Sequence, residues 1–212
     1  MNTEMLVFII EIIGTVAFAS SGAMVGIRKK MDIFGVIVMA VMPAVGGGII
    51  RDLVLGIHPP NTFKDPIYVE YSVATAVILF VIFYIRKQML DSKAMFYYER
   101  IMILLDAIGL GAFTVIGVET AYEIGFVHHR FLLLFVGVIT GVGGGMIRDM
   151  MAQQIPFILV KQIYACASLI GAGVCIWLMP YHKSASMILG AVVVVIIRIL
   201  AATYRWDLPK ID

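Results

Sequence analysis

Charged residues are scarce in this sequence of 212 residues: Asp, Glu, Lys and Arg make up only 14% of it, whereas hydrophobic residues make up 61%. A soluble globular domain typically has about 25% charged residues. The shortage therefore excludes an ordinary soluble domain and indicates a chain that folds in lipid. The net charge of +2 is also too small, and too scattered over short loops, to indicate nucleic-acid binding.

Cysteine is equally scarce, with only Cys166 and Cys175. Both fall in one expected helix, and a separation of about 13 Å, at ~1.5 Å per residue, excludes a disulfide between them. The sequence has no metal-ligand spacing, nucleophile elbow, HExxH motif or P-loop. We therefore expect no enzyme, no bound metal and no cofactor.

What the sequence has instead is long hydrophobic runs. A helix that crosses a bilayer needs about 20 predominantly apolar residues, and seven such segments are present. They run from about Thr3 to Ile27, Asp32 to Leu55, Ile67 to Ile85, Phe96 to Val118, Arg130 to Ala152, after Pro156 to near Met179, and Ser184 to Ala202. The sequence thus predicts an all-α, multi-pass membrane protein with a single transmembrane domain over residues 1–212.

The basic residues predict the orientation of the chain. Lysine and arginine are concentrated in the loops that follow odd-numbered spans, beginning with residues 28–30, and in the polar tail, residues 205–212. The other loops hold fewer of them: Lys64, Arg130 and Lys183. Because cytoplasmic loops are enriched in basic residues, we expect the N-terminus outside and the C-terminus in the cytoplasm.

The chain also contains an internal repeat. Residues 46–52 read GGGIIRD and residues 143–149 read GGGMIRD, which are identical at six of seven positions and 97 residues apart. Upstream of these motifs, Glu11 aligns with Asp106 in a register of 95 residues. Downstream, the best alignment matches Tyr71 with Tyr164. Agreement over this length is not expected by chance.

Each repeating unit contains three spans, over residues 1–90 and 91–180, and the seventh helix, residues 181–204, lies outside the repeat. Since three is odd, the second unit must enter the membrane from the opposite side. The sequence therefore predicts two inverted three-helix repeats related by a pseudo-two-fold axis in the membrane plane, an arrangement that places the functional site near the midplane.

A glycine triplet lies within the second span and another within the fifth. Their residues are Gly46, Gly47 and Gly48, and Gly143, Gly144 and Gly145. Each glycine weakens a helix by about 1 kcal/mol relative to alanine, and non-helical backbone at this depth is tolerated only where protein buries it or a wet cavity adjoins it. We expect a bend or break at each triplet. The alternative is close helix packing, which glycine also permits.

Charged residues follow each triplet while still inside the span: Arg51, Asp52, Arg148 and Asp149. A charge inside a span costs about 2.5–3.5 kcal/mol, so these side chains are expected to face the bundle interior in pairs. Helical neighbours point about 100° apart, which favours pairing across helices, for example with Glu11 or Asp106, over pairing within one motif. Arginines that snorkel to the interface are the alternative.

Hydroxyl side chains lie in the same spans and offer ligands along a polar path. They are Ser20, Ser21, Thr114 and Thr140. Such hydroxyls more often bond back to the preceding helical turn.

The two GGGxxRD motifs, the seven spans and the expected topology resemble, over nearly the whole chain, the prokaryotic trimeric intracellular cation (TRIC) channels, a family also known as glycine-transporter-like or UPF0126 membrane proteins. The resemblance implies a homotrimer in the inner (plasma) membrane of a prokaryote, with one pore inside each protomer. It implies that the second and fifth helices kink at the glycines and line the pore, that the charged residues named above lie beside it, and that monovalent cations, K⁺ or Na⁺ and chiefly potassium, pass through.

Two other functions stay open. Inverted repeats with broken helices are frequent in carriers, and Arg51, Arg148 or a half-helix N-terminus can hold a carboxylate. A secondary carrier for glycine or another small zwitterion is therefore the alternative. A structural membrane protein is the third reading, but it has no need of charges near the midplane.

Overall fold

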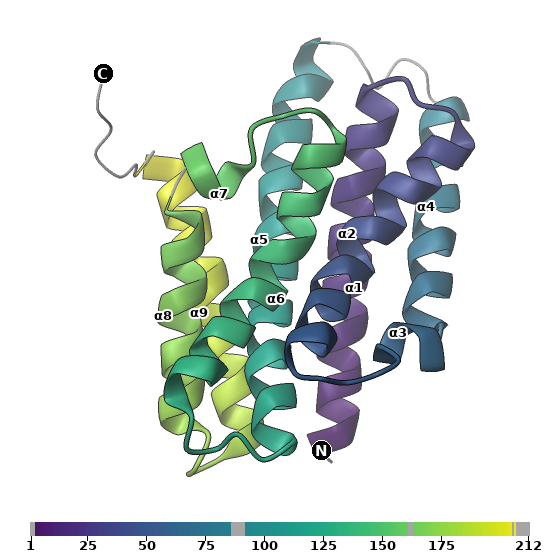
Figure 1. Cartoon of the computed structure of the whole chain (residues 1–212). Coiled ribbons are helices and arrows are strands. Elements are labelled where there is room, and N and C mark those ends of the chain that lie inside the picture. Colours follow the sequence, from purple (N-terminus) through teal and green to yellow (C-terminus); the bar gives the residue numbers. More distant parts are fainter. Residues whose placement is uncertain (1–2, 86–91, 161–162, 205, 207–212) are drawn as a thin grey trace.

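The computed structural model describes residues 3–85, 92–160, 163–204 and 206, which form a bundle of helices in which α1 begins at one end and α9 finishes at the other (Figure 1). The helices are α1 (Thr3–Arg28), α2 (Ile33–Val54), α3 (Asn61–Lys64), α4 (Ile67–Ile85), α5 (Ser92–Glu123), α6 (Arg130–Met151), α7 (Phe157–Val160), α8 (Tyr164–Leu178) and α9 (Lys183–Tyr204). Of these, α1, α2, α4, α5, α6 and α9 are long and apolar enough to cross a membrane, and α8 is apolar but shorter.

The sixth expected span is the one that differs most from the structure. It is divided into the short helix α7 and the longer α8, because Ile163 between them adopts a left-handed backbone conformation with a φ of 49°. In the first half of the chain, the short helix α3 precedes α4 in the same way. Part of the orientation prediction rests on residues outside those that the structure describes, namely Arg86, Lys87, Lys161, Arg205 and Lys210. Most of the tail, residues 205–212, also lies outside them.

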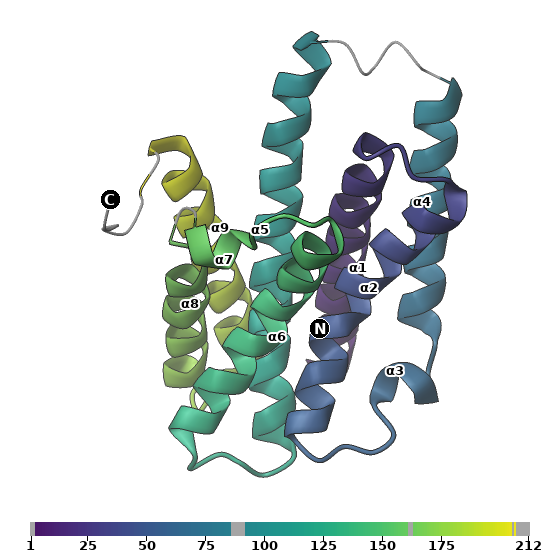
Figure 2. The same ribbon diagram turned by 45° about the horizontal axis from the view of Figure 1, so that its top comes forward.

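Two pairs of helices form the middle of the bundle. Helix α1 packs beside α5, and α2 crosses α6. Helix α4 covers one side by packing on α1 and α2, whereas α8 and α9 cover the other side by packing on α5, and α8 also contacts α6 (Figure 2). The arrangement leaves α4 at the edge, where Ser72 and Ala76 are its only buried residues.

Helix α2 remains helical from end to end. The Asp32 side chain caps it by accepting a hydrogen bond from the Gly35 backbone N–H at 2.7 Å. Pro43 lies inside the helix and has no N–H to give to the Met39 carbonyl, and Gly22 of α1 lies directly against that carbonyl. Since α6 is also continuous, the expected break at the glycine triplets does not occur. A bend of α2 and α6 at the glycine triplets stays a prediction.

The glycine triplets are where α2 and α6 cross. A β-carbon on Gly47 would overlap the carbonyl oxygen of Thr140, and one on Gly144 would overlap the carbonyl oxygen of Pro43. The two contacts are reciprocal, because Thr140 and Gly144 each lie 97 residues after Pro43 and Gly47. The middle glycine of each triplet therefore has the alternative role considered above, which is to let two helices pack closely.

An aromatic pair closes the centre of the bundle. The rings of Phe18 on α1 and Phe113 on α5 lie 5.4 Å apart, centroid to centroid, and Phe18 is completely buried. Glycines make room for both rings, since Gly14 faces Phe113 and Gly109 faces Phe18. These contacts are also reciprocal, in the register of 95 residues that relates α1 to α5.

We expect Gly144→Ala to destabilise the protein by about 1–3 kcal/mol, because the added methyl forces the α2 and α6 backbones apart. Gly173→Ala on α8 is the matched control, since no atom lies within 4 Å of the position of its β-carbon, and better helix propensity is expected to leave stability unchanged or raised. Thermal unfolding in detergent measures both variants. Equal melting temperatures would contradict a crossing of α2 and α6 too close to admit a methyl group at Gly144.

Candidate functional site

Each Arg-Asp motif ends its helix in the same local structure. On α2, Arg51 Nε donates to Asp52 Oδ1 at 2.8 Å, and Asp52 Oδ2 accepts from the backbone N–H of Asn61 at 2.7 Å. The aspartate thereby satisfies the first N–H of α3, a group that has no partner within the helix itself. The motif fixes both an arginine and the short helix that follows it.

On α6 the same contacts recur. Arg148 Nε donates to Asp149 Oδ1 at 2.9 Å, and Asp149 Oδ2 accepts from the Phe157 N–H, the first of α7, at 2.9 Å. The expectation that neighbours in one motif are poorly placed to pair is therefore wrong. The argument from β-carbon directions fails because the long, flexible arginine stem carries its guanidinium back to the adjacent carboxylate.

Arg148 lies at the centre of a completely buried cluster. Besides Asp149, its guanidinium binds Asp106 of α5, with Nη1 and Oδ1 2.7 Å apart, and donates to the Ser21 hydroxyl of α1. The side chains of Arg148 and Asp106 are each 1% exposed. The predicted pairing of Arg148 with Asp106 across helices is thus present, alongside the unexpected pairing within the motif.

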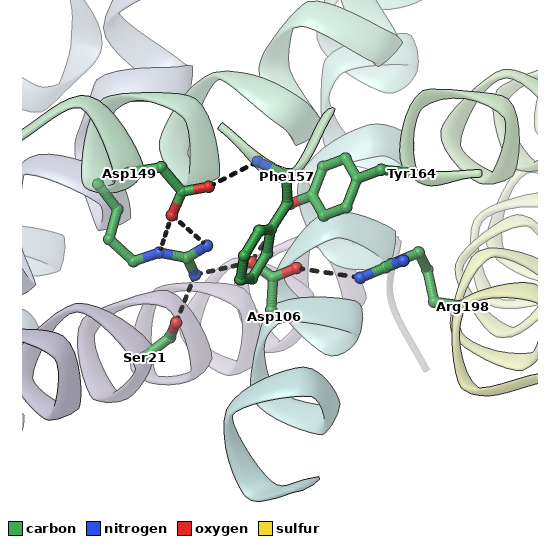
Figure 3. Close-up of polar contacts among 7 residues, drawn as sticks. Ser21, Asp106, Asp149, Phe157, Tyr164 and Arg198 are labelled. Carbon is green, nitrogen blue, oxygen red and sulfur yellow. Dashed lines mark hydrogen bonds and ion pairs between the residues drawn. The ribbon is translucent and has the colours of Figure 1, made fainter. Parts of the chain in front are cut away.

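The cluster extends to the last two helices, as Figure 3 shows for Asp106, Tyr164 and Arg198. Arg198 of α9 places Nη2 3.7 Å from Asp106 Oδ2, and its guanidinium carbon lies 4.6 Å from the ring centroid of Tyr164 on α8. The Tyr164 hydroxyl donates to Asp106 Oδ1 at 3.3 Å. Two arginines and two aspartates therefore neutralise each other where four spans (α1, α5, α6 and α9) and α8 meet, which is the pairing that buried charges require.

The other half of the bundle is open where this half is closed. Glu11 of α1, at the position equivalent to Asp106, lines a cavity of about 340 Å³ together with Gly48 and Arg51 of α2. Tyr68 of α4 donates a hydrogen bond to Glu11. The cavity wall also includes Asn61, Lys64, Asp65, Phe113 and the hydroxyls of Thr15, Thr62 and Thr120. Water can therefore reach Glu11 and Arg51 from one end of the bundle.

The remaining predicted residues lie close to these two regions. Gly48 adjoins the cavity, whereas Gly145, its counterpart, faces the Tyr164 hydroxyl and Asp106 in the buried cluster. Gly46 faces Ile147, and Gly143 packs on Gly47 and Ile50 at the helix crossing.

Of the predicted hydroxyls, Ser21 alone joins the charged cluster. Thr114 Oγ1 lies 2.7 Å from the Ser168 hydroxyl, and Thr140 Oγ1 donates back to the Val136 carbonyl at 2.6 Å. Ser20 is buried. Thr140 therefore follows the ordinary helical pattern that the sequence also allowed, and the cavity takes its hydroxyls from other positions.

Reasoning from the sequence missed the two tyrosines and a second ion-pair cluster. The hydrogen bonds relate Tyr164 to Tyr68, whereas the sequence alignment matched it with Tyr71, which is 41% exposed. One sequence feature could have identified the two tyrosines: in each half, a tyrosine comes a few residues after the short helix, Tyr68 after α3 and Tyr164 after α7. Lys183 of α9 also pairs with Glu119 and Glu123 of α5, at 2.8 Å from Glu119.

These features define the class of the protein as a multi-pass helical membrane protein that buries paired charges inside its bundle and opens a polar cavity beside them. The chain belongs to the UPF0126 membrane protein family that includes the TRIC channels. The family model described as Glycine transporter matches it twice, over residues 8–84 and 103–180. This membership places the chain among membrane channel proteins rather than among enzymes.

Individual relatives agree over almost the full length. The chain is 38% identical to the UPF0126 inner membrane protein YadS of Escherichia coli (strain K12), over 97% of this chain and 96% of that protein. The crystal structure of a prokaryotic TRIC channel in 0.5 M KCl has a TM-score of 0.87, 34% identity, and coverage of 97% of this chain and 100% of the other. A structure that addresses conductance through TRIC cation channels gives a TM-score of 0.81 and 35% identity, covering 96% of each chain.

We expect Asp106→Asn to destabilise the protein by about 3–5 kcal/mol, because it leaves two buried arginines with one carboxylate fewer. Glu11→Gln is the matched control at the equivalent position. It is expected to cost less than about 1.5 kcal/mol, because the amide oxygen still accepts from Tyr68 and water reaches the cavity. Thermal unfolding in detergent compares the two, and equal losses would contradict the difference in burial.

Proposed function

We propose that this protein is a potassium-permeable channel for monovalent cations, with the pore inside each protomer and lined by α2 and α6. The observation that carries the proposal is the polar cavity that reaches Glu11 on one side of the α2–α6 crossing, combined with a buried carboxylate, Asp106, at the equivalent place on the other side. The similarity to TRIC cation channels supports the same function.

The two halves act, in this proposal, as inverted repeats. The family model matches each half separately, and the reciprocal contacts of Gly47 with Thr140 and of Gly144 with Pro43 are those that a two-fold axis generates. The axis would pass through the helix crossing and the Phe18–Phe113 pair. The glycine triplets would bend α2 and α6 toward the pore, and Gly48 and Gly145 would adjoin its two ends.

The arginines are compatible with cation passage because acidic residues neutralise them. An unpaired arginine beside a narrow pore would repel cations, but Arg51 pairs with Asp52, and Arg148 pairs with both Asp106 and Asp149. The conformation described here has the cavity open and the Arg148 cluster closed. It therefore corresponds to a non-conducting state with access from the side of Glu11.

The orientation and assembly complete the proposal. We place the N-terminus and the cavity outside and the C-terminus in the cytoplasm, following the loop charges. This puts the buried cluster on the cytoplasmic side. Assembly as a homotrimer follows the family name, and residence in a bacterial inner membrane follows the printed name of the Escherichia coli relative.

A carrier for glycine or another small zwitterion is the second candidate, and one observation favours it. Arg51 and Glu11 line the same cavity, so a carboxylate and an ammonium group each find an opposite charge there. The description of the family model as Glycine transporter agrees with this reading. A carrier and a channel differ in whether transport saturates with a specific substrate or gives an ion-selective current.

Current across a planar bilayer that holds the purified protein, under a potassium chloride gradient, tests the proposal. We expect discrete openings that reverse near the potassium equilibrium potential. We further expect Glu11→Gln to lower the unitary current and weaken the preference for cations over chloride, because it removes an acidic group from the cavity wall. Lys29→Gln, in an exposed loop, is the matched control for loss of a charge.

Absence of current, together with saturable glycine uptake into liposomes from the same preparation, would replace the channel with the carrier. A current that is indifferent to Glu11→Gln would remove this cavity from the ion path.

A further inference from the structure

Asp106 uses its two carboxylate oxygens differently. Oδ1 receives Arg148 at 2.7 Å and the Tyr164 hydroxyl at 3.3 Å. Oδ2 is buried and, within the part of the chain that the structure describes, accepts no hydrogen bond. The group that faces Oδ2 is the Arg198 guanidinium, at 3.7 Å. A buried carboxylate oxygen with an ion pair at this distance is less well satisfied than one that also accepts hydrogen bonds.

The repeat gives the equivalent carboxylate in the first half no counterpart of Arg198, because α9 lies outside the repeat. Glu11 lies on the wall of an open cavity, and the repeat supplies it with a tyrosine, Tyr68, but not with a counterpart of α9, which lies outside the repeat. Arg198 is therefore one charged group in which the surroundings of the two carboxylates differ. In the structure Arg198 lies beside a buried carboxylate, Asp106, whereas the equivalent carboxylate, Glu11, lines a cavity.

Tyr164 gives Arg198 a second favourable contact. The guanidinium carbon lies 4.6 Å from the ring centroid, a distance at which the face of the ring attracts a cation. Arg198 can therefore move away from Asp106 along the ring without losing all its stabilisation. A cation of similar charge that reached Oδ2 would restore the neutrality of the cluster.

We propose that Asp106 is a binding site for a permeating monovalent cation and that Arg198 of α9 is a tethered competitor which occupies this site in the closed state. The inference rests on the proposed channel function and adds the residue that holds the cytoplasmic side shut. Without Arg198, the cluster of Arg148, Asp106 and Asp149 has one excess negative charge, which attracts a cation and water.

The concentration dependence of the potassium current tests the competition. If Arg198 leaves the site available for about one tenth of the time, Arg198→Gln lowers the potassium concentration for half-maximal current about tenfold. Arg198→Lys keeps the charge and is expected to remain close to the wild type. An unchanged half-maximal concentration in a conducting Arg198→Gln channel would overturn the inference, whereas a silent wild type would overturn the proposed function instead.

A binding measurement tests the same site without any current. We expect potassium chloride, compared with choline chloride at equal ionic strength, to raise the melting temperature of Arg198→Gln in detergent but not that of the wild type. The double variant Asp106→Asn/Arg198→Gln removes the site while leaving Arg148 and Asp149 as a neutral pair, so it is expected to lose the effect.

If Arg198→Gln does not fold, Arg198→Met, which keeps an unbranched stem against Tyr164, carries both measurements. Potassium stabilisation that is equal in the wild type, the single variant and the double variant would overturn the assignment of Asp106 as the cation site.

Discussion

Neutralisation of buried arginine is the constraint on which the rest of this structure depends. Arg148 lies inside a bundle whose outer surface faces hydrocarbon, where an uncompensated charge is very costly. Its partners come from different helices: Asp106 from α5, Ser21 from α1 and its own neighbour Asp149 from α6. The contacts with Asp106 and Ser21 fix the positions of α5 and α1 relative to α6. The electrostatic requirement therefore also determines where the helices lie.

The same requirement links the charged residues to the connections that follow α2 and α6. Asp149 binds Arg148 with one oxygen and the first N–H of α7 with the other, and Asp52 does the same for Arg51 and α3. A movement of either arginine would thus be transmitted to the short helix behind it. The two motifs make the same local contacts, and they differ in what surrounds them: a cavity for Arg51 and a buried cluster for Arg148.

The sequence predicted six of the spans and the pairing of Arg148 with Asp106, because these depend on strong signals: the length of apolar runs and the cost of charge in lipid. It did not predict that Arg148 binds Asp149, since the bend of a long side chain is not encoded in helical spacing. It also missed Tyr68 and Tyr164, whose partners lie 57 and 58 residues away along the chain. Glu11 lines a cavity and Asp106 is buried although the two align in the repeat, so the repeat pattern alone does not predict this difference.

The reciprocal packing of Gly47 on Thr140 and of Gly144 on Pro43 has a consequence for ancestry. Two copies of one three-helix chain, inserted in opposite directions, would make this same pair of contacts, because each copy would offer its glycine to the other's carbonyl. A duplicated and fused gene would inherit an interface that already fitted. After such a fusion, changes at the crossing would have to be matched in both halves, whereas residues that face α9 would have no such restriction. Gly47 and Gly144 thus make equivalent contacts in the two halves, whereas Arg198 of α9 contacts a carboxylate of the second half, Asp106.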